Sequence, residues 1–292
     1  MIPICIGFIG FGEVGRIFAR ATADKGARVR VFDVLLLESG GQALVGVPNN
    51  HPNITIASLP ELVSASDYIL STVTTDVALQ VARDCSAFLT PGKTYVDLNS
   101  TSPDLKKKIG AAIEATGADF VEGAILGAVG ASGAATRVLL TGSQAQMIAE
   151  MLSGLGLNCL TFGSKVGDAA AFKMLRSVFS KGIECLLLEM LTAGRRAGID
   201  SALWQDVTEF MSENPFEIVA ANWIQSHAVA YERRYHEMVQ VVESLEGLRI
   251  QPVMSQATKT FFERSLDLGL DAVFAHRPED PESVIEFMAE KL

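Results

Sequence analysis

Three glycines near the N-terminus have the spacing of a phosphate-binding turn. Gly10, Gly12 and Gly15 follow an apolar run, and a helical pattern begins directly after Gly12. Gly10 would permit a tight turn, Gly12 would let the backbone approach a pyrophosphate, and Gly15 would let the helix pack on a sheet. The N–H groups at the helix start would then face the phosphates. The residues predicted to bind a dinucleotide here are Gly10, Phe11, Gly12, Glu13 and Val14.

An acidic residue at the end of the next apolar run bears on the choice of cofactor. A carboxylate at the position of Asp33 accepts hydrogen bonds from ribose hydroxyls and repels a 2′-phosphate. The following residues, 34–37, are Val-Leu-Leu-Leu and offer no cation for that phosphate. We therefore expect NAD. NADP stays open, because Asp33 could cap a turn while Arg28 or Arg30 reaches the phosphate.

The first half of the chain alternates short apolar runs with helical stretches such as 13–24 and 104–116. This alternation predicts a mostly parallel, doubly wound α/β sheet, and strands that are apolar throughout fit a sheet covered on both faces. The predicted strands are residues 4–9, 27–32, 54–57, 68–73, 94–98, 119–122, 138–141 and 157–162.

After residue 163 the strand pattern stops. Residues 165–196 are predicted to form one long helix, and further helices are predicted at 202–213, 216–245, 252–268 and 281–291. We therefore expect a dinucleotide-binding Rossmann domain over residues 1–163, followed by an all-α domain over residues 164–292 for substrate binding and dimerisation.

The composition excludes some classes of partner. The chain has 34 acidic and 24 basic residues and a formal net charge of -10, whereas nonspecific binding of nucleic acid needs a basic face. No uncharged stretch is long and unbroken enough to predict a membrane span. The mean hydropathy of +0.28 is high, and the apolar subunit interface of a homodimer would explain it.

The cysteines and the N-terminus both indicate the cytoplasm. Cys5, Cys85, Cys159 and Cys185 lie far apart without a CxxC spacing, so we expect reduced, buried thiols. The apolar N-terminus has no basic region and runs into the glycine motif, so we expect a strand there rather than a signal peptide.

Four blocks of the sequence resemble the β-hydroxyacid dehydrogenase family, whose relatives include 6-phosphogluconate dehydrogenase. The blocks are GFIGFGEVG at 7–15, DLNSTSP at 97–103, FVEGAILGA at 120–128 and GSKVGDAAAFK at 163–173. The resemblance implies a Rossmann domain followed by a helical domain, and a dehydrogenase acting on CH–OH groups. It also implies a substrate-binding loop at Gly127 and a catalytic role for Lys173.

Two departures from the family pattern affect the substrate more than the reaction. Where the family has Ser-Gly-Gly, this chain has Leu126-Gly127-Ala128, so we expect a less polar pocket. Where the family has Asn shortly after the lysine, this chain has Arg176 and Ser177. The runs 173–182 and 233–238 are similar to an uncharacterised 6-phosphogluconate dehydrogenase-like branch with a C-terminal domain of unknown function.

A neutral amine at Lys173 could accept the proton of a substrate hydroxyl while hydride leaves for the nicotinamide. The pKa of the lysine must then fall below its usual value of about 10.4, and burial or a nearby cation would lower it. We expect Arg176, one helical turn on, to lower that pKa and to hold an acidic group of the substrate. Ser177 shares this face, and a solvated cationic helix face is the alternative.

Polar residues follow two of the predicted strands at their carboxyl ends, where open α/β sheets place ligands. Asn99 and Ser100 are expected to contact the substrate, and Asn99 the cofactor as well, unless they only form a turn and helix cap. The segment Thr72, Val73 and Thr74 is expected to line the dinucleotide groove, unless it is an ordinary strand end.

The histidines indicate a functional site less clearly than the motifs above. His236 follows Arg233, Arg234 and Tyr235, and this basic cluster could close the substrate site, even from a partner subunit. A solvated helix face is the alternative. No histidine has the spacing of a metal ligand, so we expect no metal.

Together these patterns predict an NAD(P)-dependent oxidoreductase that interconverts a small hydroxy acid and its keto acid, with Lys173 as general acid/base. Three alternatives stay open at this point: oxidative decarboxylation of a sugar acid, reduction of an imine, and a nonenzymatic dinucleotide sensor.

Overall fold

The computed structural model describes residues 4–37 and 51–292. The chain divides into two compact units, Met1–Ser177 and Val178–Leu292. The division falls inside one continuous helix, α9 (Asp168–Ala197), rather than in a linker. The boundary at residue 163 that the sequence predicts lies before this helix and stays a prediction.

Within the described residues, the first unit contains an eight-stranded sheet with the order β3-β2-β1-β4-β5-β6-β7-β8. Neighbouring strands are parallel except for β6 and β7, which confirms the predicted mostly parallel, doubly wound sheet. The strands are β1 (Cys5–Ile9), β2 (Arg28–Phe32), β3 (Ile54–Ile56), β4 (Tyr68–Ser71), β5 (Thr94–Asp97), β6 (Asp119–Leu126), β7 (Arg137–Thr141) and β8 (Asn158–Gly163).

Strand β6 is longer than the sequence predicts. The sequence predicts a strand that ends at residue 122, but residues 123–126 continue it because they pair antiparallel with β7. Gly123 suits this crowded place, since a Cβ on it would lie 2.4 Å from Leu98 Cδ2. The loop therefore begins only at Gly127, after the strand has ended.

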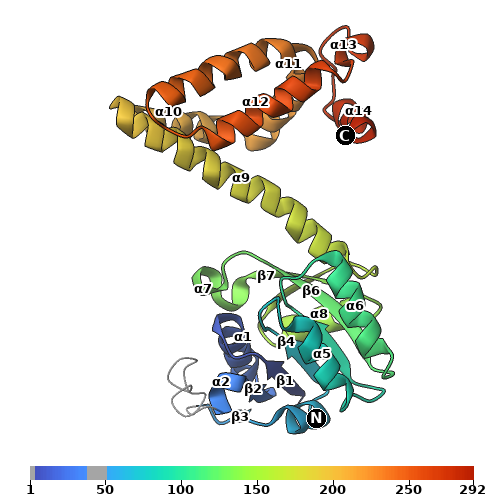
Figure 1. Cartoon of the computed structure of the whole chain (residues 1–292). Helices are drawn as coiled ribbons and strands as arrows, with labels where there is room; N and C mark the ends of the chain where they lie inside the picture. Colours follow the sequence, from blue (N-terminus) through green and yellow to red (C-terminus); the bar gives the residue numbers. More distant parts are fainter. Residues whose placement is uncertain (1–3, 38–50) are drawn as a thin grey trace. The chain divides into compact units, whose positions relative to one another are not determined.

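Helices cover both faces of the sheet, as the apolar strands predict. On one face, α1 (Glu13–Asp24) and α8 (Ala145–Gly154) contribute Phe18 and Ile148 to a buried cluster with the strands. On the other face lie α4 (Leu59–Ala65), α5 (Ala78–Ser86) and α6 (Pro103–Glu114), with α5 and α6 side by side (Figure 1). The shorter elements are α2 (Val34–Leu37), α7 (Val129–Ser132) and the 3-10 turn η1 (Gly133–Ala135).

The second unit is helical. Beyond the C-terminal part of α9 it contains α10 (Asp200–Glu213), α11 (Phe216–Gly247), α12 (Val253–Leu266), α13 (Leu270–Val273) and α14 (Glu282–Lys291). Helices α11 and α12 pack along each other (Figure 1). Glu189 of α9 caps α12, because its carboxylate accepts hydrogen bonds from the backbone N–H groups of Met254 and Ser255, each at 2.8 Å.

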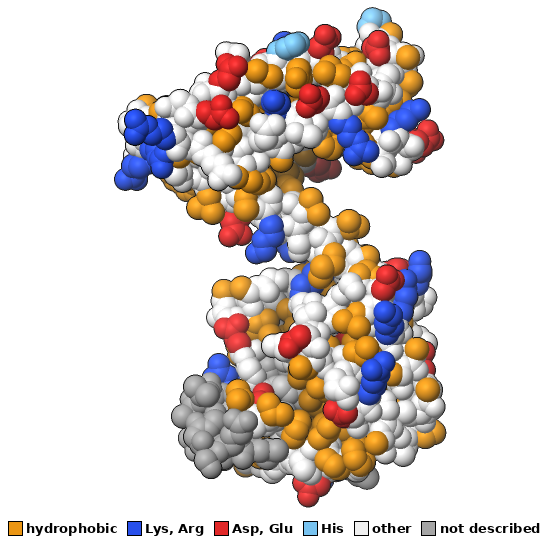
Figure 2. Space-filling view, in the orientation of Figure 1, with side chains coloured by type: hydrophobic (Ala, Val, Ile, Leu, Met, Phe, Trp, Pro, Cys, Tyr) orange, Lys and Arg blue, Asp and Glu red, His pale blue; other side chains and the backbone are white. Residues whose placement is uncertain are grey.

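Many apolar side chains of this helical unit are exposed. Val178, Leu188 and Ile218 are 72%, 62% and 65% exposed, and Figure 2 shows hydrophobic side chains spread between the charged ones. Among the described residues, no helix combines the length and apolar character that crossing a bilayer requires.

The cysteines differ in part from the prediction. All four lie in the described part of the chain and are free there, and burial raises the pKa of Cys85 and of Cys159 to about 12. Cys5 is also buried, but Cys185 is exposed on α9, so the expectation that all four thiols are buried is wrong. Cys185 lies in the helical unit, where few side chains are covered.

Candidate functional site

The glycine turn after β1 is held between two other strands. Gly10 has a φ of +89°, and its N–H donates to Phe32 O of β2 at 2.8 Å. The hydroxyl of Thr72, just after β4, donates to Gly10 O at 2.8 Å. A Cβ at Gly10 would lie 2.6 Å from Thr72 O, and one at Gly15 would lie 2.1 Å from Gly10 O. Only glycine fits at these two positions.

The middle glycine borders open space, as the binding of a ligand requires. A Cβ at Gly12 would meet nothing within 4 Å, and α1 begins at the next residue. The first N–H groups of a helix lack partners within the helix and carry partial positive charge. These residues therefore fit a dinucleotide whose phosphates rest on the start of α1.

Asp33 braces the glycine turn from the end of β2. One carboxylate oxygen accepts a hydrogen bond from Phe11 N at 2.7 Å, and the other accepts one from Leu35 N at 2.9 Å. The residue thus caps its own turn, as the alternative interpretation holds. Its lone pairs exceed these two bonds, so contact with a ribose stays compatible with this arrangement.

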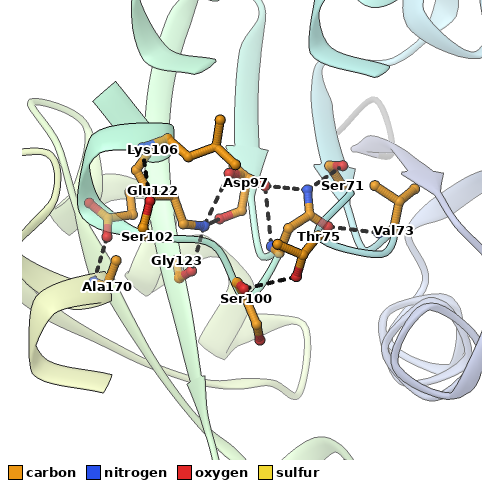
Figure 3. A network of polar contacts seen from close by, with 12 residues as sticks. Ser71, Val73, Thr75, Asp97, Ser100, Ser102, Lys106, Glu122, Gly123 and Ala170 are labelled. Atoms are coloured by element: carbon orange, nitrogen blue, oxygen red, sulfur yellow. Dashed lines mark hydrogen bonds and ion pairs between the residues drawn. The ribbon is translucent and has the colours of Figure 1, made fainter. Parts of the chain in front are cut away.

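Asn99 joins the ends of β4 and β5, where Figure 3 labels its partners Ser71, Val73 and Asp97. It is buried, and its amide donates to Ser71 Oγ at 3.0 Å and to the carboxylate of Asp97. Its side-chain oxygen accepts from Val73 N at 2.7 Å. Because both amide donors bind protein groups, the predicted contacts of Asn99 with substrate and cofactor stay predictions.

Ser100 and Lys173 meet at the carboxyl end of the sheet. The ammonium of Lys173 donates to Ser100 Oγ at 2.5 Å, and the backbone oxygen of Ser100 accepts from the hydroxyl of Thr75 at 2.9 Å. Lys173 is half-buried, and burial, followed by the charge of Lys106, lowers the pKa of its amine. The sequence placed these two residues in one site, and the structure brings their polar atoms into contact.

The charge that lowers the pKa of Lys173 is not the predicted one. Arg176 is exposed on α9, where water screens its guanidinium, whereas Lys106 is 1% exposed. The electrostatic cause is therefore Lys106, which the sequence did not single out. Ser177 uses its hydroxyl to donate to the backbone oxygen of Lys173 at 2.8 Å, within the same helix.

A buried carboxylate holds the start of α9. Glu122 of β6 has no exposed surface, and it accepts hydrogen bonds from Ala170 N at 2.6 Å, from Thr141 Oγ1 at 2.8 Å and from Gly167 N. It thereby caps the helix that carries Lys173. An acidic residue in the middle of a strand, next to Phe120 and Val121, was the sequence signal for this role, since a buried charge must be paired or hydrogen-bonded.

The apolar neighbours of Lys173 also have a structural part. Leu126 packs with Phe172 around buried Ala124, Leu139 and Ala169, and so supports the start of α9. Gly127 follows β6 with a φ of +134°, which favours glycine. The predicted substrate contact of Gly127 and the less polar pocket inferred from Leu126 both stay predictions.

The remaining predicted residues lie apart from this cluster along the chain. Thr74 is exposed after β4, next to Val73. His236 is exposed on α11 in the helical unit, in a groove with Arg233 and Glu237, which pair with each other.

Within residues 4–37 and 51–292, no group of three or more His, Cys, Asp or Glu is arranged to hold a metal ion.

The sequence matches two family profiles. Residues 5–163 match the NAD binding domain of 6-phosphogluconate dehydrogenase, and residues 195–265 match a domain of unknown function. An uncharacterized 28.5 kDa protein of Methanothermus fervidus is 28% identical over 88% of this chain and 97% of its own length. The mitochondrial 3-hydroxyisobutyrate dehydrogenase of Drosophila melanogaster is 24% identical over 69% of this chain and 62% of its own length.

Solved structures also show similarity to dinucleotide-binding oxidoreductases and their relatives. A conserved protein of unknown function, described as similar to 3-hydroxyacid dehydrogenases, is 31% identical, with a TM-score of 0.59 over 92% of this chain and 97% of that one. An imine reductase from Myxococcus stipitatus in complex with NAD+ has a TM-score of 0.74 at 21% identity, over 98% of this chain and all of that one, which shows the shared fold alone. The chain belongs to the 3-hydroxyacid dehydrogenase family, in the branch that joins a 6-phosphogluconate dehydrogenase-type NAD-binding domain to a C-terminal domain of unknown function.

Proposed function

We propose that the protein is an NAD(P)-dependent oxidoreductase that interconverts a small hydroxy acid and its keto acid, with Lys173 as general acid/base. The observation that carries this proposal is the contact between the Lys173 amine and the Ser100 hydroxyl, 2.5 Å apart, at the carboxyl end of the sheet. Open α/β sheets bind their ligands at this edge.

The cofactor would lie along the glycine turn. The backbone of Gly10–Val14 would hold its phosphates, Asp33 would face its ribose, and residues 72–74 would line its groove. When bound, the nicotinamide supplies the hydride acceptor for alcohol oxidation. We propose NAD, on the carboxylate of Asp33, with NADP as the second cofactor to test.

The proton step falls to the protein. Lys173 in its neutral form accepts the proton of the substrate hydroxyl, and as an ammonium it returns that proton in the reverse reaction. Ser100 orients the amine through the hydrogen bond between them. Arg176, with Ser177 beside it on α9, would hold the acidic group of the substrate, and Gly127 would border the same space.

The test is a substrate panel with NAD and NADP, run on the parent, on Lys173→Ala and on Lys108→Ala. The panel contains 3-hydroxyisobutyrate, 2-(hydroxymethyl)glutarate, 6-phosphogluconate and a cyclic imine. Lys173→Ala is expected to lower kcat by about 10²- to 10⁴-fold, the usual worth of a general acid/base, with the cofactor Kd unchanged. Lys108, exposed on α6, is the control that should keep parental kcat.

The panel also separates the alternatives. A sensor would bind cofactor without turnover that depends on Lys173, and an imine reductase would turn over only the imine. Release of CO2 from 6-phosphogluconate would indicate oxidative decarboxylation. Either of the first two results would contradict the proposed function.

We further propose a homodimer formed through the helical unit, which its exposed apolar side chains support. We also propose a cytoplasmic location, on the widely spaced cysteines, and no nucleic-acid partner, on the net charge of -10. No metal is proposed, because no histidine has the spacing of a metal ligand.

A further inference from the structure

Lys106 of α6 is a lysine enclosed in the protein near the site. Its side chain is 1% exposed, and all three of its ammonium contacts are with protein oxygens (Figure 3). The Nζ atom lies 2.7 Å from Asp97 O, 3.1 Å from Gly123 O and 3.1 Å from the Asp97 carboxylate. These contacts give the charge one fixed position.

Burying an ion pair costs desolvation free energy. Asp97 has no exposed surface, so both charges of the pair are removed from water, and hydrophobic residues of similar volume would often stabilise the fold equally well. Packing alone therefore does not explain the buried charge of Lys106. No step of the proposed reaction uses Lys106 directly.

The contacts of Lys106 surround the turn that carries Ser100. Asp97 ends β5 and lies directly before this turn, and Gly123 belongs to β6, so the ammonium joins both strands to α6. At the other end of the turn, Ser102 caps α6 by accepting from Leu105 N at 3.3 Å. Inside the turn, the Asp97 carboxylate also accepts from Asn99 N at 3.2 Å.

We propose that Lys106 is a positioning residue for Lys173: its buried ammonium fixes the turn that presents Ser100 and places a positive charge that favours the neutral Lys173 amine. The inference deepens the proposed function and rests on it for the role of Lys173. The direction of the Lys173 pKa agrees, since it is lowered first by burial and then by Lys106.

The other charged groups around the start of α9 affect Lys173 less than Lys106 does. Asp97 opposes the charge of Lys106 in part, and Glu122 is occupied by the N–H groups of the first turn of the helix. Asp104, Lys107, Lys108, Lys165 and Arg176 are exposed, where solvent screens their charges. Asp168 is half-buried and pairs with Lys165 at 3.8 Å.

The experiment measures the pKa of the Lys173 amine without relying on turnover. The full-length protein is labelled with trace acetic anhydride across a pH series, and the acetylation of each lysine is quantified by mass spectrometry. The variants are Lys106→Met, Asp97→Asn, the double variant K106M/D97N, and Lys108→Met as a matched exposed control on the same helix. Circular dichroism identifies the variants that fold.

Lys106→Met is expected to raise the labelling pKa of Lys173, because the positive charge that disfavours its ammonium is lost. Asp97→Asn is expected to lower it, because Lys106 is then unopposed, and Lys108→Met should leave it unchanged. If the single variants do not fold, the double variant decides, with an upward shift expected. Loosening of the turn alone would not shift the two single variants in opposite directions.

An unchanged labelling pKa in every folded variant, or a shift in the same direction for Lys106→Met and Asp97→Asn, would overturn the inference. A kcat/KM pH profile then links the effect to catalysis, and its acidic limb should move with the labelling pKa. Shifted labelling in a protein that turns over no hydroxy acid would support the role of Lys106 and contradict the proposed function, so the two failures are distinguishable.

Discussion

At the scale of single residues, Lys173 is held in a state that costs stability. Burial lowers its pKa below the usual value of 10.5, so between the two values the unfolded chain binds more protons than the folded one. Stability from this group therefore rises with pH through that window, and its cost is greatest at pH values below both pKa values. A group kept for chemistry, rather than for packing, has this signature.

Lys173→Met is accordingly expected to raise Tm slightly at pH 7, with a gain that shrinks as the pH approaches 10.5. The measurement is differential scanning calorimetry at pH 7 and at successively higher pH, with Lys108→Met as the exposed control. A lower Tm for Lys173→Met at pH 7 would mean that its bond to Ser100 outweighs the cost of burying the amine.

The sequence predicts some residues of the site and not others, for physical reasons. The glycines and Asp33 follow from backbone requirements that leave a local pattern, and the pair of Ser100 and Lys173 follows from the family resemblance. Lys106 and Glu122 are different, because a charged residue is assumed to be exposed until the neighbours that bury it are known. Lys106 does share a helix face with Ile109 and Ile113, and this was the available signal.

At the scale of elements, the junction of β6 and α9 depends on one carboxylate. Glu122→Gln is expected to lower the free energy of unfolding by about 1–3 kcal/mol, because an amide nitrogen would face an N–H donor. The kcat should fall as well, since the helix that carries Lys173 loses its cap. Urea unfolding measures the first effect, and exposed Glu114→Gln on α6 is the control. Equal stability of the two variants would contradict the capping role.

The helical unit contains its own titrating group. His227 of α11 lies among the rings of Phe262 at 5.4 Å and Phe261 at 6.0 Å, and its Nε2 is 3.1 Å from Ser265 Oγ of α12. Burial, and then the charge of Arg234, lowers the pKa of His227 below 6.5, so the unfolded chain binds its proton first as the pH falls. Stability is therefore lost below pH 6.5.

We expect the Tm of the helical unit to fall between pH 6.5 and pH 5, and His227→Phe to reduce that fall. Calorimetry at several pH values measures it, and exposed His276→Asn serves as the control. The same decline in His227→Phe as in the parent would assign the pH dependence to other groups.

The predicted strands and long helices match the structure because each leaves a periodic apolar pattern. The short helices α7 and α13 do not, since four residues are too few for a period to show. The extension of β6 was missed for another reason: Gly123 interrupts the apolar run after Glu122, and glycine weakens the strand pattern.

At the scale of the whole molecule, the helical unit leaves apolar surface without a partner. It contains a cavity of about 1080 Å³, lined by Leu186, Trp223 and Phe261 among other apolar residues. Leu186→Asp is expected to convert the proposed dimer to monomer, as measured by analytical ultracentrifugation. Met147→Asp is the control, because Met147 is 43% exposed and Leu186 is 45% exposed. A monomeric parent protein would contradict the dimer.

The division of the chain inside α9 could not be predicted from the sequence. The helical pattern continues without a break through residue 177, and where compact units separate depends on contacts rather than on propensity. The two-part organisation itself was visible, because strand signals end at residue 163 and helical ones continue.

Strand β6 fixes the spacing between Glu122 and Gly127. Glu122, which caps the helix that carries Lys173, and Gly127, at the proposed substrate side, are set apart by a fixed length of paired backbone. A slip of one residue in its pairing would turn Glu122 to the opposite face of the sheet. Evolution can therefore vary the loop beyond Gly127 to suit new substrates, while insertions within the strand should be rare among homologues.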